Sequence, residues 1–354
     1  MRNGVGSNMK ETKLLRVLLL GFSLMGCSKS GSPGNVAKPV EPAAGVTVSN
    51  SPAAEPTVPP LARTGPRALK TEMRNVMFHL TDKSAAHLET LSGEMWPTGR
   101  NEMVVFDDKT SFEVRVTNGA VSVTPDSLAQ IMNDHVFARE DAPLKDIEIT
   151  IDKDRLIIKG KLHNKGDIPF TTAGTVTTMP DGRLRVHTEK VSALHVPMKG
   201  MMGLFGIELA NVVNTSKIEG METDKNDLLL DLGTLLPPPH IRGKVSAVRI
   251  DKNVIVVIFG DGGKSLPPPT EKANYMTFEG GPVRFGKLFM NEADLTVLDM
   301  DPGDPLDWNQ DHYKEQLMAG YSKIKPNFGL VAYVKDYSKL GHSSGTRAAK
   351  VPAG

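Results

Sequence analysis

The chain has 354 residues, with 42 Lys and Arg against 41 Asp and Glu and a formal net charge of +1 at neutral pH. This balance argues against nucleic-acid binding, which requires a strongly basic domain or stripe, and against recruitment to anionic lipid by bulk charge. The single cysteine, Cys27, excludes an intramolecular disulfide, so the folded part must be stabilised by its own apolar core.

The first 27 residues combine a basic start, a short apolar run and the only cysteine of the chain. The apolar run, residues 17–25, is about half as long as a membrane-spanning helix. It ends in Leu24-Met25-Gly26-Cys27, with a small residue just before the cysteine and an aliphatic residue three before it. This pattern is typical of a lipoprotein signal, so we expect residues 1–26 to be a signal peptide and Cys27 to be lipidated. Met9 would begin a more compact signal.

Lipidation of Cys27 would hold the protein at a membrane, because two or three acyl chains anchor stably where one binds only marginally. Ser28 follows the cysteine, and in a Gram-negative cell a residue other than Asp there favours the outer membrane over the inner one. We therefore expect a lipid-anchored protein of the bacterial cell envelope, more specifically at the outer membrane and facing the periplasm. The alternative is an ordinary buried thiol at position 27.

Residues 27–68 form the second segment. After Cys27 they contain eight prolines with Ala, Ser, Gly and Thr between them, and almost no large apolar residue. Such a composition cannot form a core and predicts a disordered linker with a mean span of roughly 35 Å.

From Arg74 onward, apolar residues recur with a period of two, which is typical of half-buried strands. Val76, Phe78 and Leu80 share one face of the first predicted strand. The alternation over 112–123 is interrupted by Asn118-Gly119, which favours a hairpin. Further strands are expected at 147–151, 156–162, 184–191, 228–232, 245–250, 254–259, 283–290 and 295–298.

Three helices are expected. Thr124 is a good N-cap with Pro125 at the first helical position, followed by Leu128 and Ile131 at helical spacing. A second helix is expected over 199–214 and a third over 310–321. We expect one domain over residues 69–337 and a disordered tail over 338–354.

No established catalytic or metal-binding motif occurs in the sequence, so we expect no catalytic residues, no cofactor and no metal. The best metal candidate is a run of five aspartates in a loop, which suits calcium but does not follow the EF-hand pattern. Turn formation and capping of the following helix by Asp307 explain the run better. Its members are Asp299, Asp301, Asp304, Asp307 and Asp311.

Residues 196–207 combine three methionines and three glycines with other large apolar side chains. One interpretation is a core helix whose glycines permit close packing. The other is a movable apolar wall over a hydrophobic cavity, because methionine adapts to variable apolar ligands.

Short motifs along the chain resemble the LmeA-like phospholipid-binding proteins of bacterial envelopes over roughly residues 70–335. The chain departs from that family in its lipoprotein signal, its Pro-rich linker and an extra region after Gly260. The matching pieces are His135-Val136-Phe137, Ala142-Pro143-Leu144, Gly160-Lys161-Leu162-His163, Asp167-Ile168-Pro169-Phe170, Pro180-Asp181-Gly182-Arg183-Leu184-Arg185, Leu204-Phe205-Gly206, Asn226-Asp227-Leu228, Leu235-Leu236-Pro237-Pro238-Pro239 and Ile241-Arg242-Gly243.

The resemblance implies an α+β fold, mostly antiparallel β, in which a long curved sheet wraps against a few helices to form an elongated apolar groove, similar to tubular lipid-binding (TULIP) folds. It implies no catalytic residues. The expected ligand is a phospholipid or another acylated lipid, bound for transport or envelope maintenance. Two alternatives remain open: a structural or protein-interaction lipoprotein without a lipid ligand, and an enzyme acting on lipid-linked substrates.

The residues expected to line the groove are apolar and come from the alternating strands and the methionine-rich segment. They are Val114, Val116, Ile149, Ile151, Ile158, Leu162, Met198, Met201, Met202, Leu204, Phe205 and Ile207.

Overall fold

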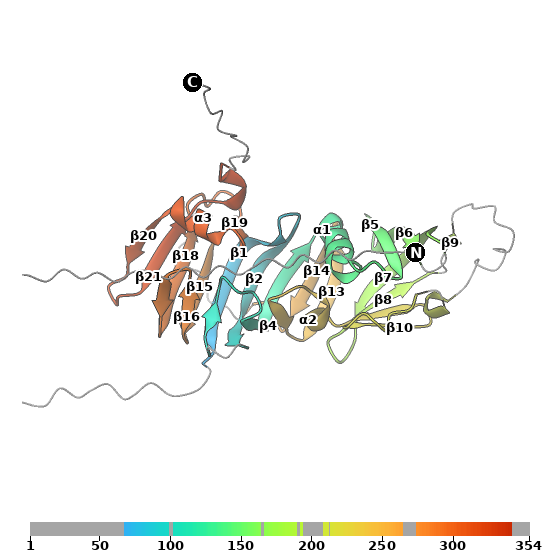
Figure 1. Cartoon of the computed structure of the whole chain (residues 1–354), viewed down its shortest axis with the longest axis horizontal. Helices are drawn as coiled ribbons and strands as arrows, with labels where there is room; N and C mark the ends of the chain where they lie inside the picture. The colour runs from blue at the N-terminus through green and yellow to red at the C-terminus, as the bar shows by residue number, and fades with distance from the viewer. Residues whose placement is uncertain are drawn as a thin grey trace, which may run out of the picture. The chain divides into compact units, whose positions relative to one another are not determined.

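The protein has an α+β fold, mostly antiparallel β-sheet with large curved sheets and few helices, as predicted (Figure 1). The computed structural model describes residues 67–98, 102–163, 166–189, 192–193, 208–211, 213–264 and 274–341, all within one compact unit that comprises residues 62–354. The expectations for the signal peptide, Cys27, nearly all of the linker, the methionine-rich segment 196–207 and residues 342–354 lie outside the described residues.

The first sheet has eleven strands among the described residues, in the order β13-β14-β4-β2-β1-β15-β18-β21-β20, with β12 pairing with β4 and β19 with β1. Most pairs are antiparallel, but β12, β19 and β21 each join a neighbour in parallel. The strands are β1 (Leu69–Thr81), β2 (Ser84–Pro97), β4 (Phe112–Val123), β12 (His240–Arg242), β13 (Val245–Asp251), β14 (Val254–Phe259), β15 (Tyr275–Gly280), β18 (Ala293–Asp299), β19 (Leu306–Asn309), β20 (Tyr321–Ile324) and β21 (Leu330–Val334).

The hairpin predicted at Asn118-Gly119 is wrong, because β4 runs unbroken from Phe112 to Val123. Asn118 and Gly119 instead lie where the pairing of β4 with β2 shifts register. The Asn118 Oδ1 atom accepts a hydrogen bond of 3.0 Å from the backbone of Asp261, and a Cβ on Gly119 would lie 3.0 Å from the carbonyl oxygen of Thr90. The pair therefore marks an irregularity inside a long strand, and β14 supplies the neighbour expected from the return strand.

The second sheet has the order β10-β11-β8-β7-β6-β5, with β9 pairing with β7. The strands predicted at 147–151 and 156–162 are confirmed, and as β5 and β6 they form a hairpin with its turn at Lys153-Asp154. Another turn precedes β8, where the Met179 amide donates to the Arg183 carbonyl oxygen at 2.8 Å. The strands are β5 (Leu144–Asp152), β6 (Arg155–Leu162), β7 (Ile168–Thr178), β8 (Leu184–Thr188), β9 (Ser192–Ala193), β10 (Met221–Asp224) and β11 (Asp227–Leu230).

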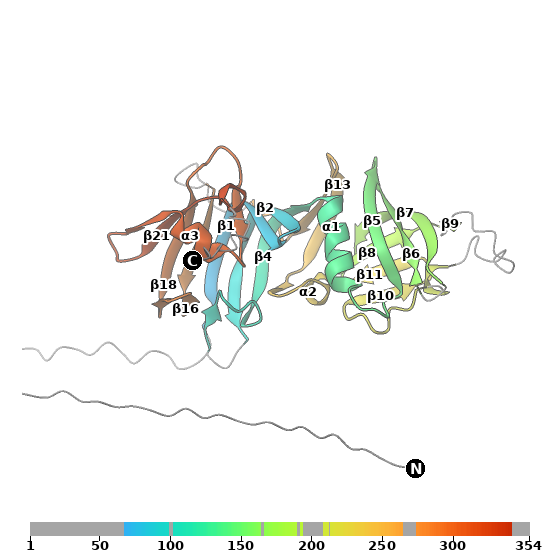
Figure 2. The same ribbon diagram turned by 45° about the horizontal axis from the view of Figure 1, so that its top comes forward.

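The first predicted helix is confirmed. The hydroxyl of Thr124 accepts a hydrogen bond from the backbone of Ser127, so α1 (Pro125–Ile131) begins where the sequence predicts, and a π-helical turn over Met132–Val136 continues it. Helix α1 packs against β5 of the second sheet and β2 of the first (Figure 2). A short helix, α2 (Leu232–Leu235), is capped by Asp231 and begins where a strand through residue 232 was predicted.

Near the C-terminus, three predictions need correction. The strand expected over 283–290 is two short strands, β16 (Val283–Phe285) and β17 (Leu288–Met290), which form a third sheet with β3 (Val104–Val105). The helix expected over 310–321 is shorter, α3 (Tyr313–Met318). Asp307 does not cap it, because Asp307 lies in β19 and the N-cap is His312.

The described chain continues past the expected domain boundary at residue 338, with Tyr337–Lys339 in a 3-10 turn. Among the described residues, no helix is long and apolar enough to cross a membrane.

Candidate functional site

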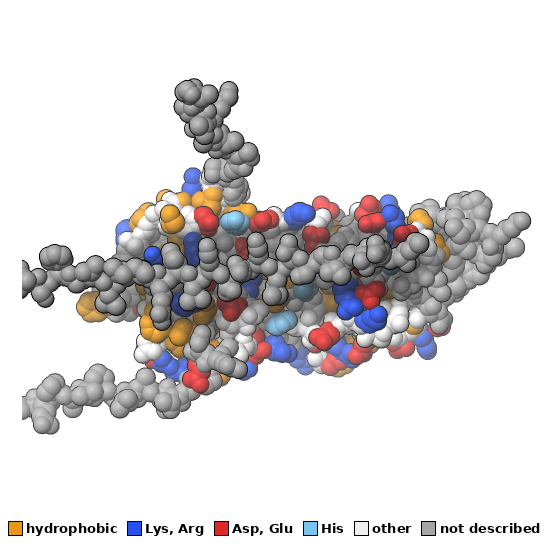
Figure 3. All heavy atoms as spheres, in the orientation of Figure 1, with side chains coloured by type: hydrophobic (Ala, Val, Ile, Leu, Met, Phe, Trp, Pro, Cys, Tyr) orange, Lys and Arg blue, Asp and Glu red, His pale blue; other side chains and the backbone are white. Residues whose placement is uncertain are grey.

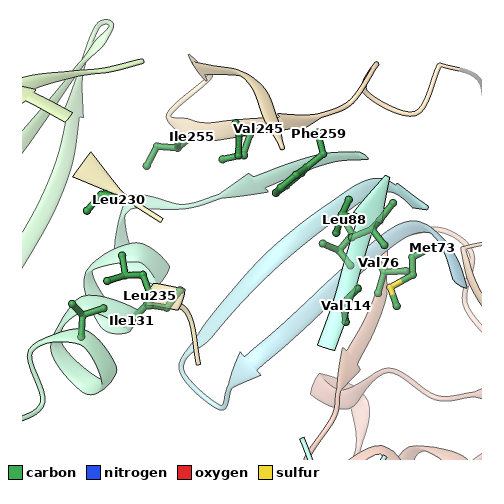
Figure 4. Close-up of a cluster of buried hydrophobic side chains, with 14 of the residues drawn as sticks. Met73, Val76, Leu88, Val114, Ile131, Leu230, Leu235, Val245, Ile255 and Phe259 are labelled. Atoms are coloured by element: carbon green, nitrogen blue, oxygen red, sulfur yellow. The ribbon is translucent and has the colours of Figure 1, made fainter. Parts of the chain in front are cut away.

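A cavity of about 230 Å³ lies among side chains of the first and second sheets and of helices α1 and α2. It is partly open to solvent. Figure 4 shows part of the buried cluster around it, with Ile131 of α1 beside Leu235 of α2, and Leu88 and Val114 from the first sheet. The lining is drawn from segments that lie far apart in the sequence, so the cavity is a product of the tertiary fold.

In the first sheet, the side of each strand that faces the cavity changes partway along the strand. In β4 the lining residues are Phe112, Val114 and Val116 before the Asn118-Gly119 irregularity, but Val121 and Val123 after it. Because strand residues alternate between faces, this change from even to odd positions means that the irregularity keeps both halves of the strand facing the same cavity.

In the neighbouring strands β2 and β1, the side that faces the cavity also changes partway along the strand. Strand β2 contributes Leu91 and Met95 from one half but Ala86 and Leu88 from the other, on either side of its register shifts with β4. In β1 the change occurs around Asn75, which has a φ of +51°. The three irregularities together let a long, bent sheet present one continuous apolar wall.

The second sheet supplies the opposite wall through ordinary alternation. Strand β5 contributes Ile147 and Ile149, and β8 contributes Leu184 and Val186. On each strand the residues between these point away, as in a sheet with one buried and one solvated face.

The lining is almost wholly hydrocarbon. Among the described lining residues, polar side-chain groups are limited to the indole N–H of Trp308 and the amide of Gln310, whose Nε2 atom donates to the backbone oxygen of Phe106 at 3.4 Å. Trp308, which also borders the cavity, is fully buried. The described lining contains no titratable side chain, so it offers neither an acid nor a base for catalysis and no ligand set for a metal.

The size of the cavity fits one hydrocarbon chain. A single water-sized group needs roughly 10–15 Å³ by the same measure, and a methylene group is of similar size. The volume of about 230 Å³ is more than ten times that minimum, so a stretch of hydrocarbon chain several methylene groups long can enter the cavity.

The structure brings only some of the sequence-predicted groove residues to this cavity. Val114, Val116, Ile149 and Ile158 border it. Ile151 and Leu162 belong to the same apolar core but do not border the cavity. The six candidates from the methionine-rich segment lie outside the described residues: Met198, Met201, Met202, Leu204, Phe205 and Ile207.

Sequence reasoning missed most of the lining. The alternation of Leu184 and Val186 is a signal that was available, since it matches that of Ile147 and Ile149. No comparable signal exists for β2, because Leu88, Leu91 and Met95 do not follow a period of two.

The aspartate run lies away from the cavity and is bridged by a lysine. Oxygen atoms of Asp299, Asp304 and Asp336 lie within 4.8 Å of one another. The ammonium group of Lys339 donates to Asp301 and Asp336 at 2.8 Å each, and to Asp304 at 3.3 Å. These hydrogen bonds raise the pKa of Lys339 and lower that of Asp301, whereas burial raises the pKa of Asp299.

Comparison with known proteins gives no relative: no protein-family model, no curated protein and no solved structure matches this chain.

Proposed function

We propose that this protein is a non-enzymatic lipoprotein of the bacterial envelope that binds the acyl chain of a phospholipid or another acylated lipid in the cavity between its sheets. The proposal rests mainly on the lining, which among the described residues is apolar apart from the Gln310 amide and the indole N–H of Trp308. The resemblance to LmeA-like phospholipid-binding proteins and the lipoprotein signal expected at Cys27 support the same function.

The free energy of burying methylene groups favours binding of an acyl chain of the length common in membrane lipids. Each buried methylene contributes about 0.8 kcal/mol, so a 16-carbon chain gains on the order of 10 kcal/mol before the costs of ordering are subtracted. A chain leaving a bilayer already occupies an apolar medium, so this gain offsets its removal and makes exchange between membrane and protein reversible.

The chemistry of the lining also limits what is recognised. A polar headgroup buried in this cavity would find almost no hydrogen-bond partner, which costs several kcal/mol. The headgroup therefore stays at the solvent-facing opening, and selection acts mainly on the hydrocarbon chain.

Uptake of a fluorescent fatty-acyl probe tests the proposal. We expect its emission to rise on mixing with the protein, and phospholipids with different headgroups but the same chains to displace it with affinities within a few fold of one another. The proposal is contradicted if the probe does not bind, or if a short-chain phospholipid with the same headgroup displaces it as well as the long-chain form.

A further inference from the structure

The large apolar side chains that the fold leaves exposed are confined to one stretch of the chain. In the described parts of the molecule, every strongly exposed one falls between residues 288 and 328, and residues 67–287 contribute none. Figure 3 shows hydrophobic side chains gathered at the end of the protein that carries β16, β18, β20 and β21. The residues are Leu288, Phe289, Met300, Met318, Tyr321, Ile324 and Phe328.

Two of the three most exposed, Phe328 and Ile324, lie on the β20–β21 hairpin, and the third, Met318, ends α3. Strand β20 is the edge of the first sheet, and its register with β21 runs from Tyr321 opposite Tyr333 to Ile324 opposite Leu330. At the tip, Phe328 is 90% exposed and Ile324 is 75% exposed. Both side chains are therefore free to contact a surface outside the described chain.

The turn holds the phenylalanine in place. The amide of Lys325 donates to Gly329 at 2.7 Å, and the amide of Phe328 donates to Lys325 at 2.9 Å. Phe328 has a φ of +66°, a conformation that bulky residues rarely adopt and that costs energy. Glycine or asparagine would be the usual choice there, so the large side chain at the tip is not explained by the turn itself.

The stretch of sequence around the tip carries positively charged side chains and no negatively charged ones. Residues 316–335 contain Lys323, Lys325 and Lys335 and no Asp or Glu. Lys325 pairs with Asp294 of β18, whereas the Nζ atom of Lys323 lies 5.1 Å from the ring centre of Tyr333 and 5.6 Å from that of Tyr321.

The order of these groups along the hairpin matches the depth profile of a bilayer. Antiparallel strands rise about 3.4 Å per residue, so Tyr321 lies roughly 10 Å behind Ile324. Lys323 is next to Ile324 in the sequence, but its ammonium group lies over the Tyr321 ring. An apolar tip with a tyrosine ring and a lysine ammonium group behind it is the arrangement found at membrane interfaces, where both occupy the headgroup level.

We propose that the tip of the β20–β21 hairpin, residues 324–328, inserts into the surface of a phospholipid bilayer that contains anionic lipid. Ile324 and Phe328 enter the acyl-chain region, and Tyr321 and Lys323 lie among the headgroups. A protein partner fits less well, since stable protein interfaces bury about 1,200–2,000 Å² and two side chains on a narrow convex turn offer little of that. This contact does not require the cavity to hold a lipid.

Tryptophan fluorescence tests the insertion directly. Residues 27–354 carrying Cys27→Ser, which lack the expected signal peptide and cannot be acylated, are compared with the same protein carrying Phe328→Trp on vesicles of phosphatidylcholine and phosphatidylglycerol with brominated acyl chains. A matched control carries Asp154→Trp at the exposed tip of the β5–β6 hairpin. We expect bromine quenching at position 328 beyond the background of Trp96 and Trp308, and none at position 154.

Vesicle sedimentation gives an independent measurement that does not depend on the tryptophan variant. Ile324→Ser and Phe328→Ser together should weaken binding at least roughly tenfold, since each removes a large apolar contact with the acyl region. Added salt should weaken the binding of the parent chain as well. Equal quenching at both positions, no quenching at 328, or unchanged sedimentation of the double variant overturns the proposal. Crosslinking of β20 to a second protein chain with unchanged vesicle binding also overturns it.

Discussion

At the scale of single residues, the close approach of neighbouring backbones explains a glycine in the middle of a long strand. Gly93 lies in β2 where its pairing with β4 shifts register, and a Cβ there would overlap the carbonyl oxygen of Arg115. Glycine normally weakens a strand interior, so its presence indicates that no side chain fits.

Gly93→Ala should therefore lower the free energy of unfolding by about 1–3 kcal/mol, because the strands must move apart to accept the methyl group. Urea denaturation measures the change. Gly341→Ala is the control, since nothing lies within 4 Å of a Cβ at that position, and its effect should stay within about 0.5 kcal/mol. Equal effects of the two substitutions would show that β2 and β4 are not packed as described.

A largely buried hydrogen bond between His79 of β1 and Asp307 of β19 makes stability depend on pH. The Nε2 atom of His79 lies 2.6 Å from the Oδ1 atom of Asp307, and both side chains are less than one-fifth exposed. Burial alone would raise the pKa of Asp307, but its hydrogen bonds with His79 and Ser338 outweigh burial and lower that pKa. A lowered carboxyl pKa stabilises the fold above the ordinary aspartate value, and this stabilisation is lost as the pH falls through the folded-state pKa.

His79→Leu should lower the free energy of unfolding by about 1–3 kcal/mol at pH 7, and by less near pH 3, which is below the ordinary aspartate pKa, because part of the stabilisation by the Asp307 carboxylate is already lost there. Urea denaturation at the two pH values measures this. His187→Leu is the control, because His187 pairs with Asp227 at the surface with 56% of its side chain exposed. A loss for His79→Leu that is independent of pH would contradict the assigned role of the pair.

At the scale of elements, local signals predicted a segment correctly when its partners were close in sequence. The β5–β6 and β13–β14 pairs each have a short turn, and their register shifts lie at the ends of the strands far from that turn. Helix α1 has both a cap and a helical period. The same signals predicted strands β1, β2 and β4 only in part, because the side of each strand that faces the cavity changes along it. The change occurs at Asn75 in β1, around Leu88–Gly93 in β2 and at Asn118-Gly119 in β4. A sequence pattern cannot show whether such an interruption is a turn or a bulge until the neighbouring strand is known.

The cap of α1 offers a test at this scale. Thr124→Ala removes the hydroxyl that accepts the Ser127 amide and should cost about 1 kcal/mol of stability, whereas Thr124→Ser keeps the acceptor and should change stability by a few tenths. Thermal or urea denaturation distinguishes the two. If serine and alanine destabilise equally, the hydroxyl does not act as the cap.

At the scale of the whole molecule, the sequence predicts that an apolar cavity exists but not which segments form most of its wall. Alternation identified Val114, Val116, Ile149 and Ile158 as inward-facing, but the wall formed by β14 and α2 depends on how distant segments pack, which no local pattern records. Ile151 and Leu162 follow the same alternation but do not border the cavity. The position of an inward-facing residue along its strand decides whether it lines the cavity or packs elsewhere in the core.

Filling the cavity should abolish ligand uptake without unfolding the protein. Val121 on β4 and Val176 on β7 border the cavity and are only half-buried, so phenylalanine at both positions has room to extend into it. We expect Val121→Phe with Val176→Phe to reduce uptake of the acyl probe at least tenfold, since the added rings occupy the volume that the chain needs. Thr175→Phe, on the exposed face of β7, should leave uptake unchanged.

The central claim, that the space between the sheets holds a hydrocarbon chain, is tested most directly by identifying what the protein carries. The full chain is purified from membranes, and the lipid held without a covalent bond is extracted and quantified by mass spectrometry beside the Val121→Phe, Val176→Phe variant. The account predicts about one long-chain lipid per protein molecule, with mixed headgroups, and far less in the variant. Equal lipid in both proteins, or none in the parent chain, would contradict it.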